Sequence, residues 1–248
     1  MLSKQKIKFL NSLKMAKHRN THKLFIAEGN INVRDFIRYG MKPAELYVTE
    51  RWIERNPEQI EGVDYVEVSS DELKKVTALK NPSEVLAVFA MPETNTDFNV
   101  TNDELTLVLD DIKDPGNFGT IIRSADWFGV RNIICSTETV DAYNPKVVQA
   151  SMGSIARVSV SYTDLPEWLA AHKGINIFGA VLDGKPLKEA VQAGKGILII
   201  GSEAHGIGEE VMEFVNNPVT IPHGRGGGAE SLNASIATAI LLYAFVNR

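Results

Sequence analysis

The sequence predicts a two-domain α/β protein whose second domain is built on a mostly parallel β-sheet. Short apolar segments rich in strand-forming residues alternate with helical segments along the chain. Several of the apolar segments, such as "LTLVLDDI" and "GILIIGSE", are continuous, which is typical of strands that are buried on both faces. A polar, turn-rich stretch, "MPETNTDFNVTNDE", interrupts the alternation, and we expect the interdomain linker there, at residues 93–103.

The first domain is expected to span residues 1–92. It begins with a helix in which Ile7, Leu10 and Leu13 recur at a spacing of three. The segments that follow are, in order, a strand at "LFIAEG", a helix near Ile31–Tyr39, strands at "AELYVTE" and "DYVEVS", a short helix from Ser70 and a strand at "EVLAVFA".

Charge is unevenly distributed along the chain. The net charge is -5, yet the first 23 residues contain seven Lys/Arg residues, two histidines and no acidic residue. A local basic surface of this kind is what a nucleic-acid phosphate backbone requires. A solvated helix face is the structural alternative, and the stretch alone leaves both interpretations open.

The second domain is expected to span residues 104–248. Its predicted elements are a strand at "LTLVLDDI", a helix at "TIIRSADWFG", strands at "RNIICS", "RVSVSY", "NIFGAVL", "GILIIGSE" and "NPVTIP", and a long apolar helix after Ser231-Leu232-Asn233. Ligands of doubly wound sheets gather at the carboxyl ends of the strands. We therefore expect chemistry in three loops, "DDIKDPGNFGTIIR", "GSEAHGIG" and "PHGRGGGAESLN".

Composition excludes several classes of protein. A hydrophobic content of 44% and a charged content of 23% exclude a mainly disordered chain. The single cysteine, Cys135, excludes intrachain disulfides and multi-cysteine metal sites, and it fits a reducing cytoplasm. No export signal and no apolar run long enough for a bilayer is recognised. The glycines of "GSEAHGIG" do not follow the first strand of their unit, and no Lys-Ser/Thr pair follows them, which disfavours an NAD-dependent dehydrogenase and a P-loop protein.

Together the three loops resemble a known family. In order and spacing, "DPGNFGTIIRSADWFG", "LIIGSEAHGI" and "IP...ESLNASIA" are similar to the three motifs of the SpoU (TrmH-like) branch of the SPOUT methyltransferases. These enzymes transfer a methyl group from S-adenosyl-L-methionine to ribose 2′-hydroxyls of ribosomal or transfer RNA. The resemblance implies an α/β-knot fold with a C-terminal trefoil knot, and a homodimer. We also expect no metal and no membrane contact. The first domain looks like the family's RNA-binding module, a small α/β domain similar to ribosomal proteins.

The resemblance also implies roles for individual residues. Those expected around the reaction centre are Asn117, Arg123, Glu203, Ser231 and Asn233, and those expected to bind the cofactor through backbone groups are Gly201, Ile221 and Leu232. We expect Arg123 to bind an RNA phosphate and to favour the developing alkoxide, because a guanidinium does not lose its proton in proteins.

Each assignment has a structural alternative. Arg123 can instead stack on Trp127 or pair with Asp126 at the surface, and Asn117 can cap the helix that it is expected to precede. Glu203 can cap a helix near Ile207, but a carboxylate at this place can also hold Arg123 or Asn233 in position. His205 and His223 are left out of the catalytic set, because the family requires neither position.

The glycine-rich loop His223–Ala229 is longer than the resemblance suggests. Its Arg225 can reach an RNA phosphate or belong to a flexible, solvated turn, and the sequence favours neither. The predicted function is cytoplasmic 2′-O-methylation of a ribose, most readily in ribosomal RNA. The alternatives are the same chemistry on transfer RNA, or an RNA-binding assembly factor that has lost catalysis.

Overall fold

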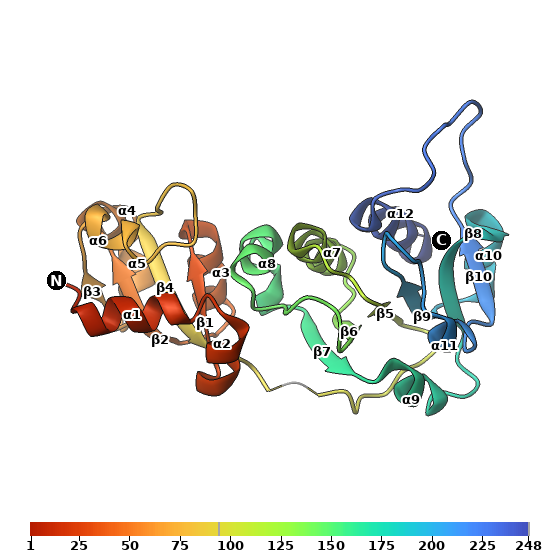
Figure 1. Ribbon diagram of the computed structural model, residues 1–248, viewed down its shortest axis with the longest axis horizontal. Helices are drawn as coiled ribbons and strands as arrows, with labels where there is room; N and C mark the ends of the chain where they lie inside the picture. Colours follow the sequence, from red (N-terminus) through yellow and green to blue (C-terminus); the bar gives the residue numbers. More distant parts are fainter. Residues whose placement is uncertain (94, 248) are drawn as a thin grey trace. The chain divides into compact units, whose positions relative to one another are not determined.

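A computed structural model describes residues 1–93 and 95–247, which fall into two compact units. Unit 1 consists of residues 1–93 together with residues 141–157, and unit 2 consists of the described residues of 94–140 and 158–248. Residues 141–157 therefore belong to the first unit, although the chain on both sides of them belongs to the second. Figure 1 traces the chain through both units.

Unit 1 contains a four-stranded sheet with the order β1-β4-β2-β3. Its strands are β1 (Leu24–Glu28), β2 (Pro43–Val48), β3 (Val66–Glu67) and β4 (Val85–Ala90). Strands β1 and β2 are antiparallel to β4, whereas β3 is parallel to β2. The strand expected at "DYVEVS" is only the two-residue β3, because it lies at the sheet edge and pairs only with Tyr47 and Val48.

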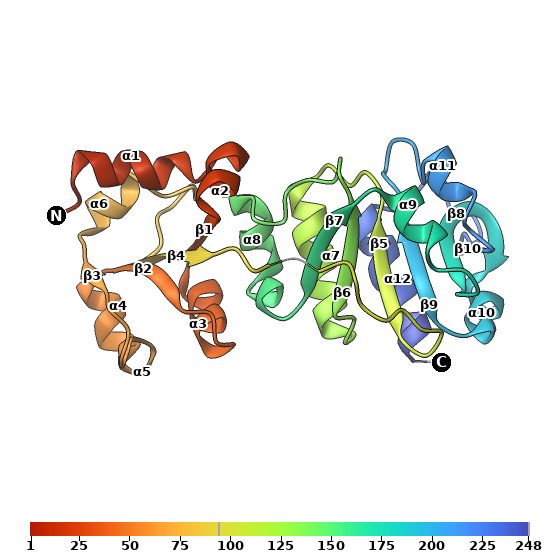
Figure 2. The same ribbon diagram turned by 90° about the horizontal axis from the view of Figure 1, so that it is seen from below.

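Helices cover both faces of this sheet. They are α1 (Lys4–Ser12), α2 (Ala16–His22), α3 (Asn30–Arg38), α4 (Glu50–Arg55), α5 (Pro57–Ile60), α6 (Ser70–Lys74) and α8 (Pro145–Ser151), followed by the 3-10 helix η1 (Ser154–Ala156). Figure 2 shows α1 and α6 on one side of the strands and α3 and α4 on the other. Leu10, Leu13 and Leu73 pack against Ile26 and Val88 in the core under α1 and α6.

The amino-terminal stretch forms two helices, where the sequence suggested one. The chain becomes extended at Met15, which precedes α2. The buried guanidinium of Arg19 donates hydrogen bonds from Nη1 to the carbonyl oxygens of Leu13 (3.0 Å) and Lys14 (2.8 Å). These bonds satisfy carbonyl groups at the end of α1, so the helix ends there without leaving them unpaired.

Unit 2 contains a six-stranded sheet with the order β10-β8-β9-β5-β6-β7, in which every neighbouring pair is parallel. The strands are β5 (Leu105–Leu109), β6 (Asn132–Ser136), β7 (Ser159–Thr163), β8 (Ile177–Pro186), β9 (Gly196–Ile200) and β10 (Asn217–Thr220). The two most continuous apolar segments form the central pair β5 and β9, and every residue of both strands is buried. The expected mostly parallel α/β fold is confirmed.

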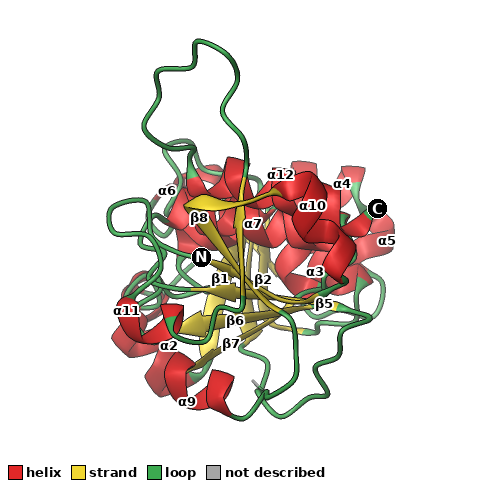
Figure 3. Ribbon diagram, turned by 90° about the vertical axis from the view of Figure 1, so that its right-hand side faces the viewer, coloured by secondary structure: helices red, strands yellow, loops and turns green. Residues whose placement is uncertain are grey.

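The helices of unit 2 lie on both faces of the sheet. They are α7 (Pro115–Trp127), α9 (Leu165–Ala170), α10 (Leu187–Ala190), the 3-10 helix η2 (Val191–Ala193), α11 (Glu209–Met212) and α12 (Ala234–Val246). Helices α7 and α12 pack together, and Figure 1 shows them on the face opposite α9 and α11. Figures 1 and 3 show the loop between β10 and α12 extending away from the other elements of its unit.

Helix α7 begins earlier than the sequence suggested. Its N-cap is Asp114, whose Oδ1 accepts a hydrogen bond from the backbone N–H of Asn117 at 2.7 Å, and Pro115 occupies the first turn. The first N–H groups of a helix have no hydrogen-bond partner within the helix, so a proline in the first turn loses nothing by lacking its own N–H. The sequence "DPGN" therefore starts the helix instead of forming a turn before it. The expectation that Asn117 lies before the helix is therefore wrong: Asn117 belongs to its first turn.

Within the described residues, no helix is both long enough and apolar enough to cross a membrane.

Candidate functional site

The first two motif loops meet because their strands are neighbours. Strands β5 and β9 pair in parallel with Leu109 opposite Ile200, and the N–H of Asp110 extends the ladder by donating to the carbonyl of Ile200 at 2.9 Å. The loops that follow these strands consequently leave the same edge of the sheet side by side. This is the edge at which parallel sheets place their ligands.

One hydrogen-bonded cluster joins all three motifs. Glu203 Oε1 accepts hydrogen bonds from Asn117 Nδ2 at 2.7 Å, from Asn233 Nδ2 at 2.8 Å and from the N–H of Ala234 at 3.0 Å. Asn233 Nδ2 also donates to Asn117 Oδ1 at 3.0 Å. We call Asn117, Glu203 and Asn233 the Asn–Glu–Asn network. Three of the five residues expected at the reaction centre are thus brought together.

Asn233 is also the N-cap of α12. Its Oδ1 accepts hydrogen bonds from the N–H groups of Ser235 (3.0 Å) and Ile236 (3.3 Å) and from the Ser235 hydroxyl (2.6 Å). Both ends of the side-chain amide are therefore engaged, which holds it in one orientation. Glu203 assists the same helix through Ala234, so it caps α12 and not the helix that follows its own loop.

The second motif loop is a tight turn. Ser202 and Gly206 exchange two backbone hydrogen bonds, each 2.9 Å long. A Cβ atom on Gly201 would lie 2.1 Å from the carbonyl carbon of Gly206, closer than any side chain can approach. Glycine at 201 thus permits the close backbone approach that presents Glu203 to the network.

Asp110 ties the end of β5 to the second motif loop, and the sequence reasoning missed it. Its Oδ2 accepts a hydrogen bond from the N–H of Gly208 at 2.7 Å, and the side chain is buried. Burial raises the pKa of Asp110, the hydrogen bond from Gly208 opposes that rise, and the charges of Asp111 and Glu138 add to it. The available signal was an acidic residue placed directly after a fully buried strand.

A pocket of about 320 Å³ opens beside the network. It is lined by Asp111, Ile112, Lys113, Asp114, Ser202, Glu203, Ala204, His205 and Ala234. Lys113 pairs with Asp111 and donates to the carbonyl of Glu138 at 2.8 Å, so its ammonium group is already engaged. His205, which the sequence reasoning set aside, lies in this wall.

Arg123 and Ser231 are placed differently from the other three expected residues. Arg123 is exposed on α7, six residues after Asn117, which corresponds to about 9 Å along a helix axis. In the described part of the chain, no cation–π contact joins Arg123 to Trp127. Ser231 is exposed in the loop before α12 and, among the described residues, makes no hydrogen bond to the network.

The residues expected to hold a nucleoside-like cofactor suit such a ligand. Ile221 directly follows β10 and Leu232 directly precedes the N-cap of α12, and for the described residues the backbone groups of both are outside the hydrogen-bonded ladders and turns. Free N–H and C=O groups can form hydrogen bonds with the edge of an adenine, and the apolar side chains beside them can pack against its face. Leu232 is 45% exposed and so has apolar surface to offer.

The glycine-rich loop is exposed from Pro222 to Asn233. Its internal hydrogen bond runs from the N–H of Gly227 to the carbonyl of Gly224, around Arg225. The structure therefore places Arg225 in a solvent-facing turn.

These features define an α/β protein with a parallel sheet, whose site is built from the loops after two adjacent central strands and the N-terminus of the last helix. Residues 104–243 match the SpoU rRNA Methylase family, and residues 4–87 match an MRM3-like substrate binding domain. The chain belongs to the SpoU rRNA methylase family, as its three motifs predicted.

Relatives match the chain along nearly its full length. The chain is 31% identical to the 23S rRNA (guanosine(2553)-2′-O)-methyltransferase RlmP of Bacillus subtilis, and the match covers 96% of this chain and 95% of the relative. A putative RNA methyltransferase of the TrmH family from Porphyromonas gingivalis has a similar solved structure, with 36% identity, a TM-score of 0.86, and coverage of 100% of this chain and 99% of the other. The AdoMet-bound rRNA methyltransferase of Sinorhizobium meliloti is 29% identical, with a TM-score of 0.86 and coverage of 99% and 95%.

Proposed function

We propose that this protein is an RNA ribose 2′-O-methyltransferase that uses S-adenosyl-L-methionine, and that its substrate is ribosomal RNA. The observation that carries the proposal is the Asn–Glu–Asn network, which joins three family motifs at the ligand-binding edge of the sheet. The similarity to RlmP, an rRNA 2′-O-methyltransferase by name, and to an AdoMet-bound rRNA methyltransferase supports the choice of substrate and cofactor.

When bound, S-adenosyl-L-methionine would supply an electrophilic methyl group: a carbon–oxygen bond to the ribose 2′-oxygen would form as the carbon–sulfur bond breaks, with S-adenosylhomocysteine as the leaving group and the hydroxyl proton passing to water. The protein must therefore hold one oxygen in line and stabilise the charge that develops on it. Backbone groups of Gly201, Ile221 and Leu232 hold the cofactor in this proposal. Reaction in a positioned complex needs no metal.

Glu203 is proposed to orient the ribose hydroxyl. Its Oε1 already accepts three hydrogen bonds, and for the described residues its Oε2 takes part in none. A free carboxylate oxygen beside the pocket can accept a hydrogen bond from a 2′-hydroxyl. Asn117 and Asn233 are the positioning residues that keep the carboxylate fixed.

Arg123 and Ser231 are proposed to engage the RNA. Arg123 is exposed, and its guanidinium can bind a phosphate by two parallel hydrogen bonds and favour the alkoxide that forms. Ser231, in the exposed loop before α12, can donate a hydrogen bond from its hydroxyl to the substrate once the loop closes over the substrate.

Residues 1–92 are proposed to form the RNA-binding domain, residues 93–103 the linker and residues 104–248 the methyltransferase domain. The match of residues 4–87 to a substrate binding domain supports the first of these assignments. We place the activity in the cytoplasm, where ribosomal RNA is made in bacteria such as those that contain the relatives above. The trefoil knot stays a prediction of the resemblance.

A homodimer is proposed through the methyltransferase domain. Helix α12 exposes Ile236, Ile240 and Tyr243 on one side, and Trp127 of the adjacent α7 is 83% exposed. A helix that is apolar on all sides is normally buried, so this surface suits a second copy of the chain. Sedimentation velocity should show a dimer that Ile240→Asp converts to a monomer, while Leu182→Asp, at another exposed apolar position, does not.

The function is tested by incubating the protein with radiolabelled S-adenosyl-L-methionine and total RNA, followed by nuclease digestion. We expect label in a 2′-O-methylated nucleoside of ribosomal RNA. The Arg123→Ala variant should lose the transfer while retaining cofactor binding by calorimetry. Label only in transfer RNA would correct the substrate, and no label in any RNA would favour a non-catalytic assembly factor.

A further inference from the structure

The two amino-terminal helices of unit 1 carry basic side chains that lack carboxylate partners. Lys4, Lys8, Lys17 and Lys23 are exposed, and within residues 1–93 and 95–247 none of them forms an ion pair. The other basic residues of these helices are engaged: Lys6 pairs with Glu45, and the buried Arg19 pairs with the partly buried Asp141.

Basic residues elsewhere in unit 1 are more often neutralised. Arg51 and Arg55 of α4 share Glu84 at 3.2 and 3.7 Å, and Lys74 of α6 pairs with Asp71 at 2.7 Å. Because the first 23 residues contain no acidic residue, the positive charge of α1 and α2 is not cancelled locally. Among the described residues, Arg38 of α3 and Lys146 of α8 are also exposed and form no ion pair. Helices α1 and α2 differ in carrying three such lysines, Lys4, Lys8 and Lys17, with no acidic residue beside them in the sequence.

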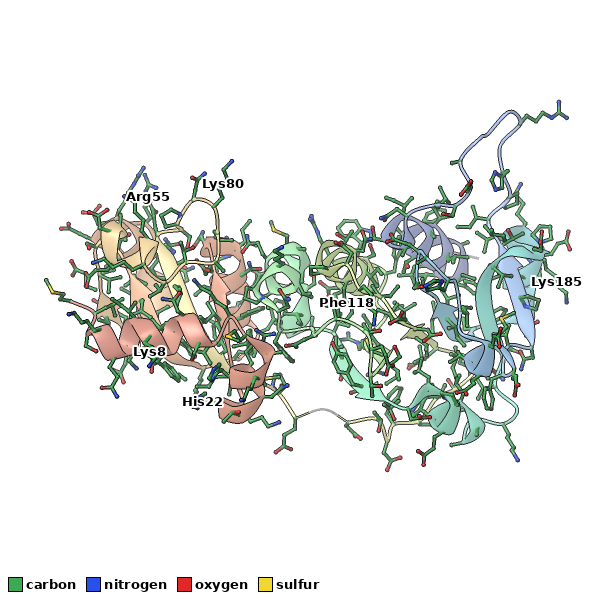
Figure 4. The ribbon with its side chains drawn as sticks, in the orientation of Figure 1. Lys8, His22, Arg55, Lys80, Phe118 and Lys185 are labelled. Carbon is green, nitrogen blue, oxygen red and sulfur yellow. The ribbon has the colours of Figure 1, made fainter. Side chains whose placement is uncertain are left out.

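Aromatic rings lie among these lysines. His18 and His22 are one turn apart on α2, and their ring planes differ by 11° with centroids 6.4 Å apart. The rings of Phe9 of α1 and His22 are nearly perpendicular, with an interplanar angle of 78° and centroids 5.3 Å apart. His22 is exposed, and Figure 4 shows it on the same side of unit 1 as Lys8, with Lys80 on the opposite side.

We propose that Lys8, Phe9, Lys17, His18, His22 and Lys23, here called the α1–α2 face, bind an unpaired segment of the substrate RNA. The histidine rings stack on an exposed base, and the lysines contact the phosphates on either side of it. The inference rests on the proposed function, since it names the RNA element that the substrate-binding domain reads.

The chemistry of the face selects single-stranded RNA over a duplex. Bases in a duplex are already stacked on each other, and the deep, narrow major groove of A-form RNA does not admit side chains. An unpaired base offers a free π-face, and stacking on an aromatic side chain contributes about 1–3 kcal/mol, which equals roughly 5- to 150-fold in affinity. Lysines alone would bind duplex and single strand with little distinction.

The test measures RNA affinity of the full chain by fluorescence anisotropy. The probes are a labelled single-stranded RNA of about 12 nucleotides and the same RNA annealed to its complement. We expect His22→Ala to weaken single-strand binding roughly 10-fold and duplex binding less than about 2-fold. Lys17→Gln is expected to weaken both, and to lower the slope of log affinity against log salt by about 1.

Controls separate stacking from folding and from general charge. His22→Phe keeps a ring and should restore single-strand binding to within about 3-fold of wild type. Lys80→Gln removes one exposed charge from the opposite side of the unit and should leave both affinities unchanged within about 2-fold. Equal losses for single strand and duplex in His22→Ala, no loss in that variant, or a loss in Lys80→Gln that matches Lys17→Gln would overturn the proposal.

Methyl transfer is measured separately on total RNA with each variant. If the proposed function is correct, His22→Ala raises the RNA concentration needed for half-maximal transfer and leaves the rate at saturating RNA unchanged. If the wild-type protein methylates no RNA, the proposed function fails, while the anisotropy comparison still decides whether the α1–α2 face reads unpaired RNA.

Discussion

Replacing Glu203 by glutamine tests the Asn–Glu–Asn network more sharply than deleting the side chain. The amide keeps an oxygen that can accept the hydrogen bonds from Asn117, Asn233 and the N–H of Ala234. It replaces the free Oε2 with an NH₂ group, which donates and cannot accept a hydrogen bond from a ribose hydroxyl. The substitution therefore leaves the scaffold almost intact and removes the proposed catalytic acceptor.

The magnitudes follow from the geometry. Three hydrogen bonds at an exposed carboxylate compete with water, so truncation to alanine should lower the free energy of unfolding by about 1–2 kcal/mol in total. The glutamine variant should lose less than about 0.5 kcal/mol, as surface substitutions usually do. Loss of the positioned acceptor should lower the rate of methyl transfer roughly 100-fold in both variants.

The assay is single-turnover transfer of a radiolabelled methyl group to RNA, with urea unfolding and cofactor calorimetry on the same preparations. Glu209→Gln, at an exposed position of α11 in the same unit, is the matched control and should transfer at the wild-type rate. Transfer by Glu203→Gln within about 3-fold of wild type would refute the role of Oε2. If Glu203→Ala were also active, the network would serve only to cap α12.

Three further predictions concern the scaffold. Gly201→Ala should weaken cofactor binding at least about 10-fold, as measured by calorimetry, because the added Cβ would displace the backbone of Gly206. If this variant bound the cofactor with wild-type affinity, the turn between Ser202 and Gly206 would not need to be tight for binding. Burial raises the pKa of Asp110, so the folded state holds that proton more tightly, and this stabilisation is lost as pH rises above the ordinary aspartate range. Asp110→Asn should therefore gain stability relative to wild type in urea unfolding as pH rises from about 4, the ordinary aspartate pKa, through the raised pKa of the folded state, and a pH-independent difference would contradict the assignment. Arg19→Ala should lower the free energy of unfolding of unit 1 by about 3 kcal/mol, because it leaves Asp141 without its buried partner. The control Arg55→Ala, at an exposed ion pair, should lower it by less than about 1 kcal/mol. Equal losses in the two variants would show that the Arg19–Asp141 pair stabilises the unit no more than an exposed pair does.

The periodic parts of the fold were predictable from the sequence, because burial imposes a pattern on residues. Strands β5 and β9 are buried at every residue and apolar except at Thr106, because helices cover both faces of the sheet. Elements held by local chemistry were harder to place. Helix α7 begins at "DPGN", a sequence that is equally typical of a turn. The break between α1 and α2 depends on the buried Arg19, whose role cannot be predicted from the spacing of apolar residues.

The site residues were predicted from motif similarity, and the structure shows which of them are in contact. The pairing of β5 with β9 brings Asn117 to Glu203, which are 86 positions apart in the sequence. Asp110 escaped notice because a carboxylate after a strand has many roles, and only the 2.7 Å hydrogen bond to Gly208 distinguishes this one. Among the described residues, neither Arg123 nor Ser231 forms a hydrogen bond with the network, so the roles proposed for them are in binding the RNA.

The most direct measurement of the central claim is a map of ribose methylation across the RNAs of a strain that lacks this protein, compared with its parent. We predict that one 2′-O-methyl group disappears from ribosomal RNA, that the wild-type gene restores it, and that a gene encoding Arg123→Ala does not. Identical maps for the deletion strain and its parent would contradict the claim, and so would restoration by the Arg123→Ala variant.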